Sequence, residues 1–454
     1  SIMGSGDVLL AALAVSAAGS TLISGSAAMV LDAMSPSAQG QIEVTGEATI
    51  NFGELLISSA ATAPISGNGS VSLESLISDA DGLTLIMGSA GASLSELGSS
   101  AAGNTFVVAN ASTSFDALSP SAQGQVMIAA EIGITFGELL LSSAGVTFVS
   151  GDGSVFLESL ISDADGSTLG GIMGNADIIL AGLNASASGG ILVAAAADIS
   201  LVTLDLNAAG AITIAADGES TLAGLMPSST AGIDIFGIAT ISLESLMPSS
   251  DGSVTAGITG DAAISLDGLN ASAAGNVFIA GDAATTLDVL TISSQAQLDV
   301  FANGTPTLAA LLPSAAGNVD IFAVAAISLG SLIVSADGSV SSGISGSAAV
   351  TLGEIGISAD GSTFVVGNAT TSLGTLTISG QGQINIFGEA TIALDTLVPS
   401  GSGTVDVFAT AIIGLDDIIP VADGGVTAGS ISASGDIILG ELSVLASATH
   451  DFVI

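Results

Sequence analysis

Aspartate pairs that stand one residue apart and precede a glycine are the residues of this chain best suited to chemistry. They occur at Asp79 and Asp81 and again at Asp163 and Asp165, each pair within a DADG sequence. Hard cations such as calcium bind clustered carboxylate oxygens, so these turns are candidate calcium sites. No cofactor is required on this interpretation, and screening of the turns by salt is the simpler alternative. Single Asp-Gly turns complete the candidate set at Asp251, Asp337 and Asp423.

Groups suited to catalysis are scarce. His450 is the only histidine, so a Ser-His-Asp triad has a single candidate base and zinc lacks its usual ligands. Carboxylate pairs, to which Asp416 and Asp417 add another, serve glycoside hydrolases. Sugar binding also draws on stacking aromatics and basic donors, and the chain has no Trp, Tyr, Lys or Arg. We therefore predict that the protein is not an enzyme and that its acidic turns keep it soluble.

The charge of the chain limits its partners. Its 454 residues include 42 acidic side chains and no Lys, Arg or Cys. Such a chain cannot neutralise phosphates or approach an anionic membrane surface, which excludes nucleic acid and anionic membranes as partners. Trypsin-like proteases would find no cleavage site, which suits a protein exposed outside a cell.

No transmembrane helix or signal peptide is predicted. The longest apolar segment, ILVAAAADISLVTLDL (191–206), is interrupted by Asp198 and Asp205 and alternates like a strand. The first residues, SIMGSGD, lack a basic signal-peptide region and an initiator Met, so we expect a processed protein or a fragment.

Two nested repeats organise the chain. The Asp-Gly pairs at Asp81, Asp165, Asp251, Asp337 and Asp423 are 84, 86, 86 and 86 residues apart. Each such superunit holds four shorter repeats of about 20 to 22 residues, with the consensus V-x-I-x-G-x-A-x-x-x-L-x-x-L-x-x-S-A-x-G, and we estimate about 21 of them over the chain. Because no linker interrupts them, we predict a single continuous β-repeat domain over residues 1–454.

The short repeat has the period of a strand. In INIFGEATIAL (384–394), apolar or small residues alternate with others over eleven positions, which predicts one half-buried strand. The step of three from Leu394 to Leu397 predicts a bend, and the segment 399–403 predicts a turn. A coil of about 21 residues matches one turn of a β-solenoid, in which each repeat buries its apolar face against the next. The predicted fold class is therefore all-β, a β-solenoid-like stack of coils grouped in superunits of 84–86 residues.

The face opposite the predicted core is less polar than a solvated face should be. Phenylalanines return on it with the 86-residue step, and packing on a second sheet of the same chain would explain them. The alternative is contact between chains, since an exposed aromatic ladder favours association. We predict these phenylalanines as candidate assembly contacts: Phe236, Phe278, Phe301, Phe322, Phe364, Phe387 and Phe408.

Two segments carry a family resemblance. GSAAVTLGEIGISADG (346–361) and GNATTSLGTLTISGQG (367–382) resemble repeats of the tail-fibre and appendage proteins of bacteriophages and their bacterial hosts. The resemblance implies an extracellular or virion-surface β-fibre, often homotrimeric. Calcium-binding nonapeptide repeats of secreted bacterial proteins look similar in places, but GDGS (151–154) and DADGS (163–167) never recur at nine-residue spacing.

The expected function is structural, as a self-associating subunit of an extracellular or virion-surface fibre or filament. An adhesin or receptor-binding shaft that recognises a cell-surface receptor is the main alternative. An outer-membrane β-barrel is a lesser one, because short alternating strands with glycine turns also describe it, although such barrels carry girdles of Tyr and Trp.

Overall fold

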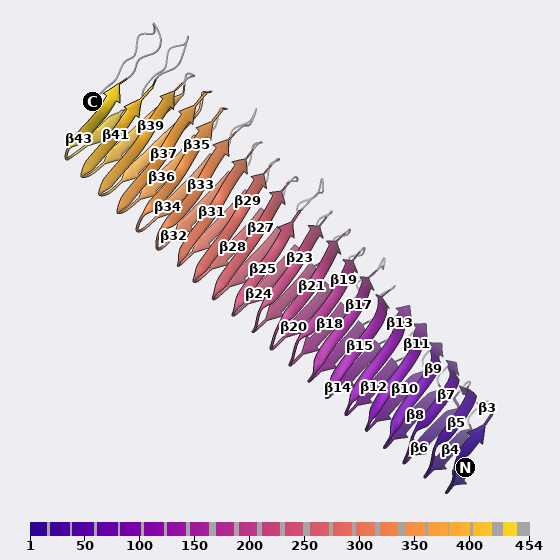
Figure 1. Cartoon of the computed structure of the whole chain (residues 1–454). Coiled ribbons are helices and arrows are strands. Elements are labelled where there is room, and N and C mark those ends of the chain that lie inside the picture. The colour runs from indigo at the N-terminus through magenta and orange to yellow at the C-terminus, as the bar shows by residue number, and fades with distance from the viewer. Residues whose placement is uncertain are drawn as a thin grey trace. The chain divides into compact units, whose positions relative to one another are not determined.

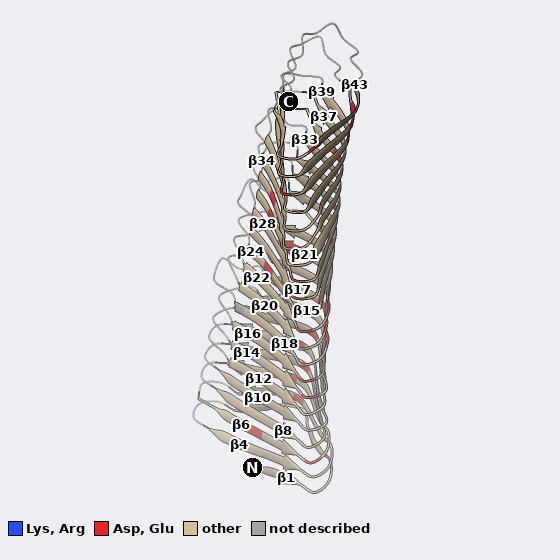
Figure 2. Cartoon of the chain, turned by 90° about the vertical axis from the view of Figure 1, so that its left-hand side faces the viewer, with Lys and Arg blue, Asp and Glu red and all other residues tan. Residues whose placement is uncertain are grey.

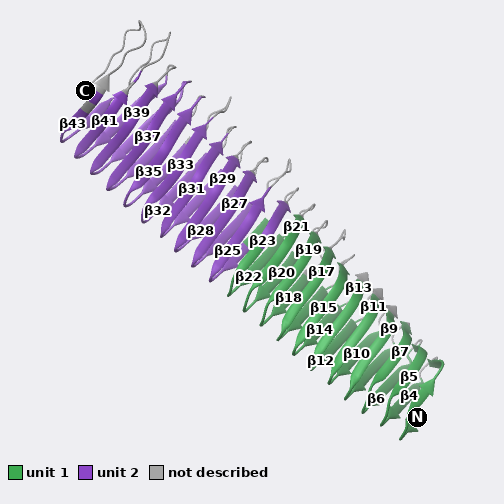
Figure 3. Cartoon of the chain, in the orientation of Figure 1, with its two compact units in different colours: residues 1–221, 231–234 green, residues 222–230, 235–454 purple. Residues whose placement is uncertain are grey.

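The computed structural model shows a protein built of strands. The described residues contain 43 strands and no helix, and they divide into two compact units (Figure 3). Unit 1 holds residues 1–221 and 231–234, and unit 2 holds residues 222–230 and 235–454. The structure describes residues 1–442 with the exception of 16–18, 37–38, 59–60, 80–81, 101–103, 122–124, 142–145, 163–168, 186–189, 207–210, 228–231, 248–254, 272–275, 293–296, 314–317, 335–340, 359–361, 380, 400–402 and 420–429.

Two kinds of strand alternate along the chain, and each kind forms its own sheet (Figure 1). We call them the short sheet, whose strands are mostly six residues long, and the long sheet, whose strands mostly have seven to ten. In unit 1 the short sheet contains β1 (Ile2–Gly4), β4 (Ser20–Gly25), β6 (Gln41–Gly46), β8 (Thr62–Gly67), β10 (Leu83–Gly88), β12 (Asn104–Ala109), β14 (Gln125–Ala130), β16 (Val146–Gly151), β18 (Leu169–Gly174), β20 (Gly190–Ala195) and β22 (Ala211–Ala216). The long sheet of unit 1 contains β2 (Val8–Leu10), β3 (Leu13–Val15), β5 (Met29–Pro36), β7 (Ile50–Ser58), β9 (Ser70–Asp79), β11 (Gly91–Ser100), β13 (Ser112–Ser121), β15 (Gly133–Leu141), β17 (Ser154–Ser162), β19 (Ile178–Ala185) and β21 (Ile199–Leu206).

Unit 2 repeats this arrangement. β23 (Ser220–Pro227) of the long sheet and β24 (Gly232–Gly237) of the short sheet give residues to both units. The short sheet continues with β26 (Thr255–Gly260), β28 (Asn276–Gly281), β30 (Gln297–Ala302), β32 (Asn318–Ala323), β34 (Ser341–Gly346), β36 (Ser362–Gly367), β38 (Gln383–Gly388), β40 (Thr404–Ala409) and β42 (Ile431–Ala433). The long sheet continues with β25 (Thr240–Leu246), β27 (Ala263–Ala271), β29 (Ala284–Ile292), β31 (Thr305–Pro313), β33 (Ile327–Val334), β35 (Val350–Ile357), β37 (Thr370–Ile378), β39 (Thr391–Pro399), β41 (Ile412–Ile418) and β43 (Ile437–Leu442).

Within each unit every strand pairs in parallel with the same strand of the next coil. β10 pairs with β12 without a break, from Leu83↔Asn104 to Gly88↔Ala109. β36 pairs with β38 at the same shift along the chain, from Ser362↔Gln383 to Gly367↔Gly388. The chain is therefore a β-solenoid with a coil of about 21 residues, as the short repeat predicts.

The 86-residue period arises from one longer coil in four. Paired residues of β16 and β18 are two residues further apart along the chain than those of the common coils, as the pairing Val146↔Leu169 shows. The same is true of β25 with β27 and of β32 with β34. Three coils of the common length and one of these longer coils make up the superunit. The registers place the two added residues after the long-sheet strand, in the sequence segments that carry the later Asp-Gly pairs.

A column of β-branched side chains runs through the core of each unit. The fourth residue of every six-residue short-sheet strand is Val or Ile, and it is almost fully buried. Stiff, branched side chains stack well at the spacing of parallel strands. In unit 1 the column is Ile23, Val44, Ile65, Ile86, Val107, Ile128, Val149, Ile172, Val193 and Ile214, and in unit 2 it includes Ile235, Ile258, Ile279, Val300, Ile321, Ile344, Val365, Ile386 and Val407.

The eleven-residue run 384–394 is not one strand, which corrects the sequence interpretation. β38 ends at Gly388, the chain turns at Glu389 and Ala390, and β39 begins at Thr391 in the other sheet. Burial still alternates across this corner, so the sequence pattern hides it. A Cβ on Gly388 would lie 2.7 Å from Cγ1 of Ile392, which shows how closely the two strands approach.

The long-sheet strands are kinked between their two central leucines. Pairing between β39 and β41 runs to Leu394↔Leu415 and resumes at Thr396↔Asp417, so that Asp395 is skipped. The bend predicted between Leu394 and Leu397 is this kink. Because the alternation restarts there, two successive residues face outward and both leucines remain buried.

Some core positions hold a hydroxyl where an apolar group would fit. Thr84 and Thr105 pair in neighbouring coils, are fully buried, and their hydroxyls have no hydrogen-bond partner among the described residues. Val126 fills the same position one coil further along. A buried hydroxyl without a partner costs roughly 1–3 kcal/mol, so these threonines are weak points of the core.

We expect Thr105→Val to stabilise the protein by about 1 kcal/mol, because it replaces an unpaired buried hydroxyl by a methyl group that the neighbouring coil already accepts. Urea denaturation followed by circular dichroism measures the change. Thr135→Val, at an exposed position of β15, is the matched control and should change stability by less than about 0.5 kcal/mol. Destabilisation by Thr105→Val would contradict the prediction.

Candidate assembly surface

The seven predicted contact phenylalanines all lie on the outer face of the short sheet in unit 2. Six of them are between 38% and 47% exposed, which is high for a phenyl ring, and Phe408 is half-buried. No described part of unit 2 covers them. The prediction that they contact another chain stays a prediction.

Six of the seven phenylalanines form two groups of three, one superunit apart, and Phe236 on β24 belongs to neither group. In the first, the ring centroids of Phe278 and Phe301 are 5.4 Å apart, and those of Phe301 and Phe322 are 5.2 Å apart and tilted by only 14°. In the second, Phe387 and Phe408 repeat the stacked geometry at 5.2 Å and 14°. Phe364 lies on β36 at the position that Phe278 has on β28. We call these two groups the phenylalanine ridges.

Stacking decides what the ridges present to a partner. In each stacked pair the ring faces are turned toward each other, so solvent meets mainly the ring edges. Sugars bind to open aromatic faces, whereas apolar edges and ridges pack into protein surfaces. The geometry therefore fits protein contact better than carbohydrate stacking.

Carboxylates flank the first ridge on the same strands. Asp299 and Asp320 occupy paired positions on β30 and β32, and Gln297 donates to both oxygens of Asp299 at 3.2 and 3.0 Å. Burial raises the pKa of Asp320, and the charge of Asp299 adds to the effect, while a hydrogen bond from the backbone of Gly343 lowers it. A Cβ on Gly343 would lie 2.6 Å from Oδ1 of Asp320, so glycine is needed for this contact.

Fewer charged side chains flank the second ridge than the first. Asn385 takes the place of Asp299, is nearly buried, and accepts a hydrogen bond from Gln383 at 3.4 Å. Asp406 takes the place of Asp320 and accepts hydrogen bonds from the backbone N–H and the hydroxyl of Ser430 at 2.7 and 3.0 Å. The second ridge thus carries one carboxylate where the first carries two.

The candidate calcium ligands lie almost entirely outside the described residues. Asp79 is the last residue of β9, but its side chain is not described. The other six, Asp81, Asp163, Asp165, Asp251, Asp337 and Asp423, fall in segments that the structure leaves out, as does His450. Asp416 and Asp417 are exposed on β41. Within the described part of the chain, no group of three or more acidic or histidine side chains is placed to hold a metal ion.

A second acidic column, which the sequence reasoning missed, follows the corner after the short sheet. In unit 1, the backbone N–H of Asp198 donates to Asp177 at 3.4 Å, and that of Glu219 donates to Asp198 at 2.7 Å. Two residues earlier in the corner, the side-chain amide of Asn175 donates to Asp152 at 2.8 Å. These carboxylates are acceptors for backbone or amide N–H groups of the next coil, so they fasten coils together. The recurrence of the three acidic residues at the length of one coil is the signal that could have revealed the column.

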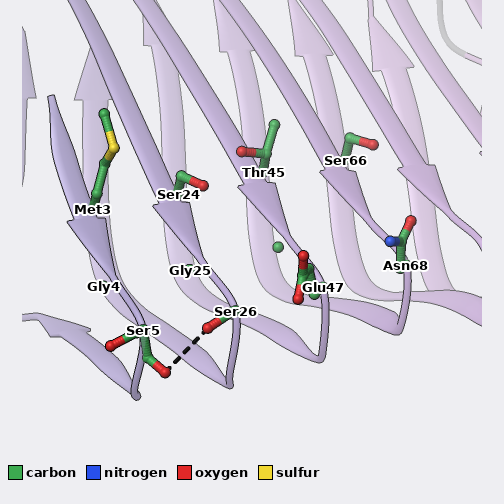
Figure 4. Close-up of a pocket in the computed structure, with 11 residues that line it drawn as sticks. Met3, Gly4, Ser5, Ser24, Gly25, Ser26, Thr45, Glu47, Ser66 and Asn68 are labelled. Carbon is green, nitrogen blue, oxygen red and sulfur yellow. Dashed lines mark hydrogen bonds between the residues drawn. The ribbon is translucent and has the colours of Figure 1, made fainter.

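An open hollow of about 540 Å³ lies along the same corner in the first coils of unit 1 (Figure 4). Its floor carries Ser24, Thr45 and Ser66 from successive strands, and the hydroxyl of Ser26 donates to the backbone carbonyl of Ser5 at 3.0 Å. Glu47 is its one charged group. The hollow is open and presents the hydroxyl groups of its lining to solvent.

Fold and surface together define a β-solenoid repeat protein, an architecture compatible with a structural fibre or an adhesin shaft. Comparison of the chain with protein-family models, with curated proteins and with solved structures finds no match. Among the residues that the structure describes, no helix has the length and apolar character of a membrane span.

We expect Asp320→Asn to stabilise the protein at neutral pH, because the raised pKa means that the folded state disfavours the charged carboxylate. The folded state then binds the proton more tightly than the unfolded state, so stability falls as pH rises from 3.8 through the raised pKa. The gain from the substitution should shrink to nothing below that window. Thermal melting between acid and neutral pH measures it.

Glu354→Gln is the control for this change, because it also removes one charge, from an exposed position whose paired neighbours are the uncharged Ser331 and Thr375. Equal effects of the two variants at neutral pH would show that net charge, and not the site, is responsible.

Thermal melting with and without calcium tests whether the acidic turns bind the ion. Calcium should raise the melting temperature of the full chain, and a chelator should lower it, if the paired aspartates hold the ion. The double variant Asp163→Asn/Asp165→Asn should reduce the shift, whereas Glu354→Gln should leave it unchanged. Identical melting with calcium and with chelator would refute the prediction.

Proposed function

We propose that the protein is a structural subunit of an extracellular or virion-surface fibre or filament, formed by self-association. The observation that carries the proposal is the pair of phenylalanine ridges, one superunit apart on one exposed sheet face. An exposed apolar ladder on a regular sheet is a liability unless a partner covers it. A solenoid that repeats its ridge at a fixed interval offers neighbours a periodic set of anchors.

The size of the ridges supports contact at several places at once. A phenylalanine exposes roughly 80 Å² when about 40% of its surface is free, so three bury about 240 Å², worth about 6 kcal/mol at about 25 cal/mol per Å². Association costs about 4–15 kcal/mol in lost freedom. One ridge therefore offsets only the low end of that range, whereas two ridges on the same unit, worth nearly twice as much, reach well into it. This favours lateral assembly over isolated contacts.

The amino-acid composition supports an extracellular or virion-surface location and argues against nucleic acid and anionic membranes as partners. A chain with no Lys or Arg resists trypsin-like proteases, which suits an extracellular or virion-surface location. It offers nothing to nucleic acid or to anionic membranes. We propose no catalytic activity and no required cofactor, with calcium at the acidic turns as an optional ligand.

An adhesin or receptor-binding shaft is the second candidate. The observation that favours it is the line of amide, carboxyl and phenyl groups on one strand, such as Gln297, Asp299 and Phe301, since mixed polar and aromatic surfaces suit receptor contacts. The stacked rings make a sugar receptor a poor fit, so a receptor of this shaft would be a protein.

Electron microscopy of the native material should show fibres or filaments, and monomeric globules would refute the proposal. Phe301→Ser/Phe322→Ser should weaken lateral assembly without unfolding the chain, because both rings are about 40% exposed. Val289→Ser/Ile333→Ser removes exposed apolar groups from the long sheet of the same unit and is the matched control. Filaments that persist unchanged in the phenylalanine variant would assign assembly to other residues.

A further inference from the structure

The outer face of the short sheet in unit 1 is free of charged residues over most of its strands. Eight consecutive strands, from β8 to β22, contain no acidic residue, although the chain carries 42. Figure 2 shows these strands in tan. The strand before them in the sheet, β6, carries Glu43. Large apolar side chains stand on this face instead, and several are about 40% exposed: Leu83, Met87, Val108, Met127, Met173 and Leu192.

The long sheet of unit 1 has the opposite character. Seven consecutive strands, from β5 to β17, each place one exposed carboxylate at the kink. The carboxylates alternate between the two outward residues of the kink, so identical positions recur only every second coil, about 9.6 Å apart. They are Asp32, Glu54, Glu74, Glu96, Asp116, Glu138 and Glu158.

The outer face of β8 to β22, which we call the charge-free face, also has projections and recesses. Along the fifth residue of successive strands, the large Met87 and Val108 are followed by the small Ala129 and Ser150. A hollow of about 240 Å³ opens between Ser150 and Met173 at the edge of the face. Large and small residues in one column give a surface with both projections and recesses.

We propose that the charge-free face of unit 1 is covered by the same face of a second copy of this chain. The inference concerns different residues from the phenylalanine ridges, and it stands whether or not those ridges assemble fibres. Two copies that meet face to face form a two-fold contact, in which projections of one copy enter the recesses of the other.

Electrostatics favours a second copy meeting this face. Two chains with a formal charge of −42 repel one another, and contact through the long sheet would bring two rows of carboxylates together. The charge-free face is where two copies approach with the least repulsion. The face lacks the Trp, Tyr, Lys and Arg that anchor proteins at lipid surfaces, which makes a membrane a weaker candidate.

The area is sufficient for a stable dimer. Eight strands spaced by about 4.8 Å, each six residues long at about 3.3 Å per residue, make a face of about 750 Å². A standard interface takes about 800 Å² from each partner. Both copies have the same strand spacing, so strands that are in register at one coil stay in register along the whole face.

The test adds carboxylates to one face or the other of the same two coils. Met87→Asp/Met127→Asp charges the proposed contact, and Ser93→Asp/Thr135→Asp adds the same charge to exposed long-sheet positions. Sedimentation velocity over a range of protein and salt concentrations gives the dimer dissociation constant. We expect at least about a tenfold increase for the first variant, little change for the second, and tighter association of the unaltered chain as salt rises.

Cross-linking of single-cysteine variants gives a second measurement that does not depend on adding charge to the face. The chain has no cysteine, so Met127→Cys introduces a single thiol on the face and Thr135→Cys introduces one on the opposite sheet. Oxidative or bifunctional cross-linking should give dimers with the first and not with the second. An unaltered chain that stays monomeric, equal responses of the paired variants, or monomers that float with neutral phosphatidylcholine vesicles would each overturn the proposal.

The dimer proposal and the fibre proposal can be refuted independently of each other. Loss of the dimer in Met87→Asp/Met127→Asp with filaments intact concerns unit 1 alone. Loss of filaments in Phe301→Ser/Phe322→Ser with the dimer intact concerns the phenylalanine ridges alone.

Discussion

Hydrogen bonding between parallel strands one coil apart is the constraint on which the rest of this structure depends. Each strand finds its partners one coil before and one coil after it along the chain, and pairing such as Leu83↔Asn104 fixes which residues share a column. The side chains in each column must then pack on one another at the spacing of neighbouring strands. The Val and Ile column in the short sheet meets that demand, and glycine or alanine at the next inward position lets the chain turn into the long sheet.

The same stacking creates an electrostatic difficulty, because a residue repeated in every coil meets its own kind at about 4.8 Å. The chain has no basic residue to relieve the repulsion. Unit 1 separates its long-sheet carboxylates by alternating their positions, and at the corner it uses Asp177 and Asp198 as acceptors for N–H groups of the next coil. In unit 2, Asp299 and Asp320 stand side by side, and there the pKa of Asp320 is raised.

In unit 1, charge and apolar surface lie on different faces, whereas in unit 2 carboxylates and phenylalanines share the outer face of the short sheet. The outer short sheet of unit 1 is free of charge from β8 to β22, and that of unit 2 carries stacked phenylalanines. Neither face is covered by a described part of its own unit. An apolar sheet face on a strongly acidic chain is the kind of surface that the proposed self-association requires.

The sequence alone determined the all-β class, the length of the coil and the period of the superunit, because stacking forces chemically similar residues to recur at each coil. It did not show that the run 384–394 turns a corner at Glu389, since inward and outward residues go on alternating through the turn. It also did not show the charge-free face of unit 1, whose residues differ from coil to coil and share only the absence of charge. Tertiary structure decided these features, because a face exists only after the registers of common and longer coils place distant residues side by side.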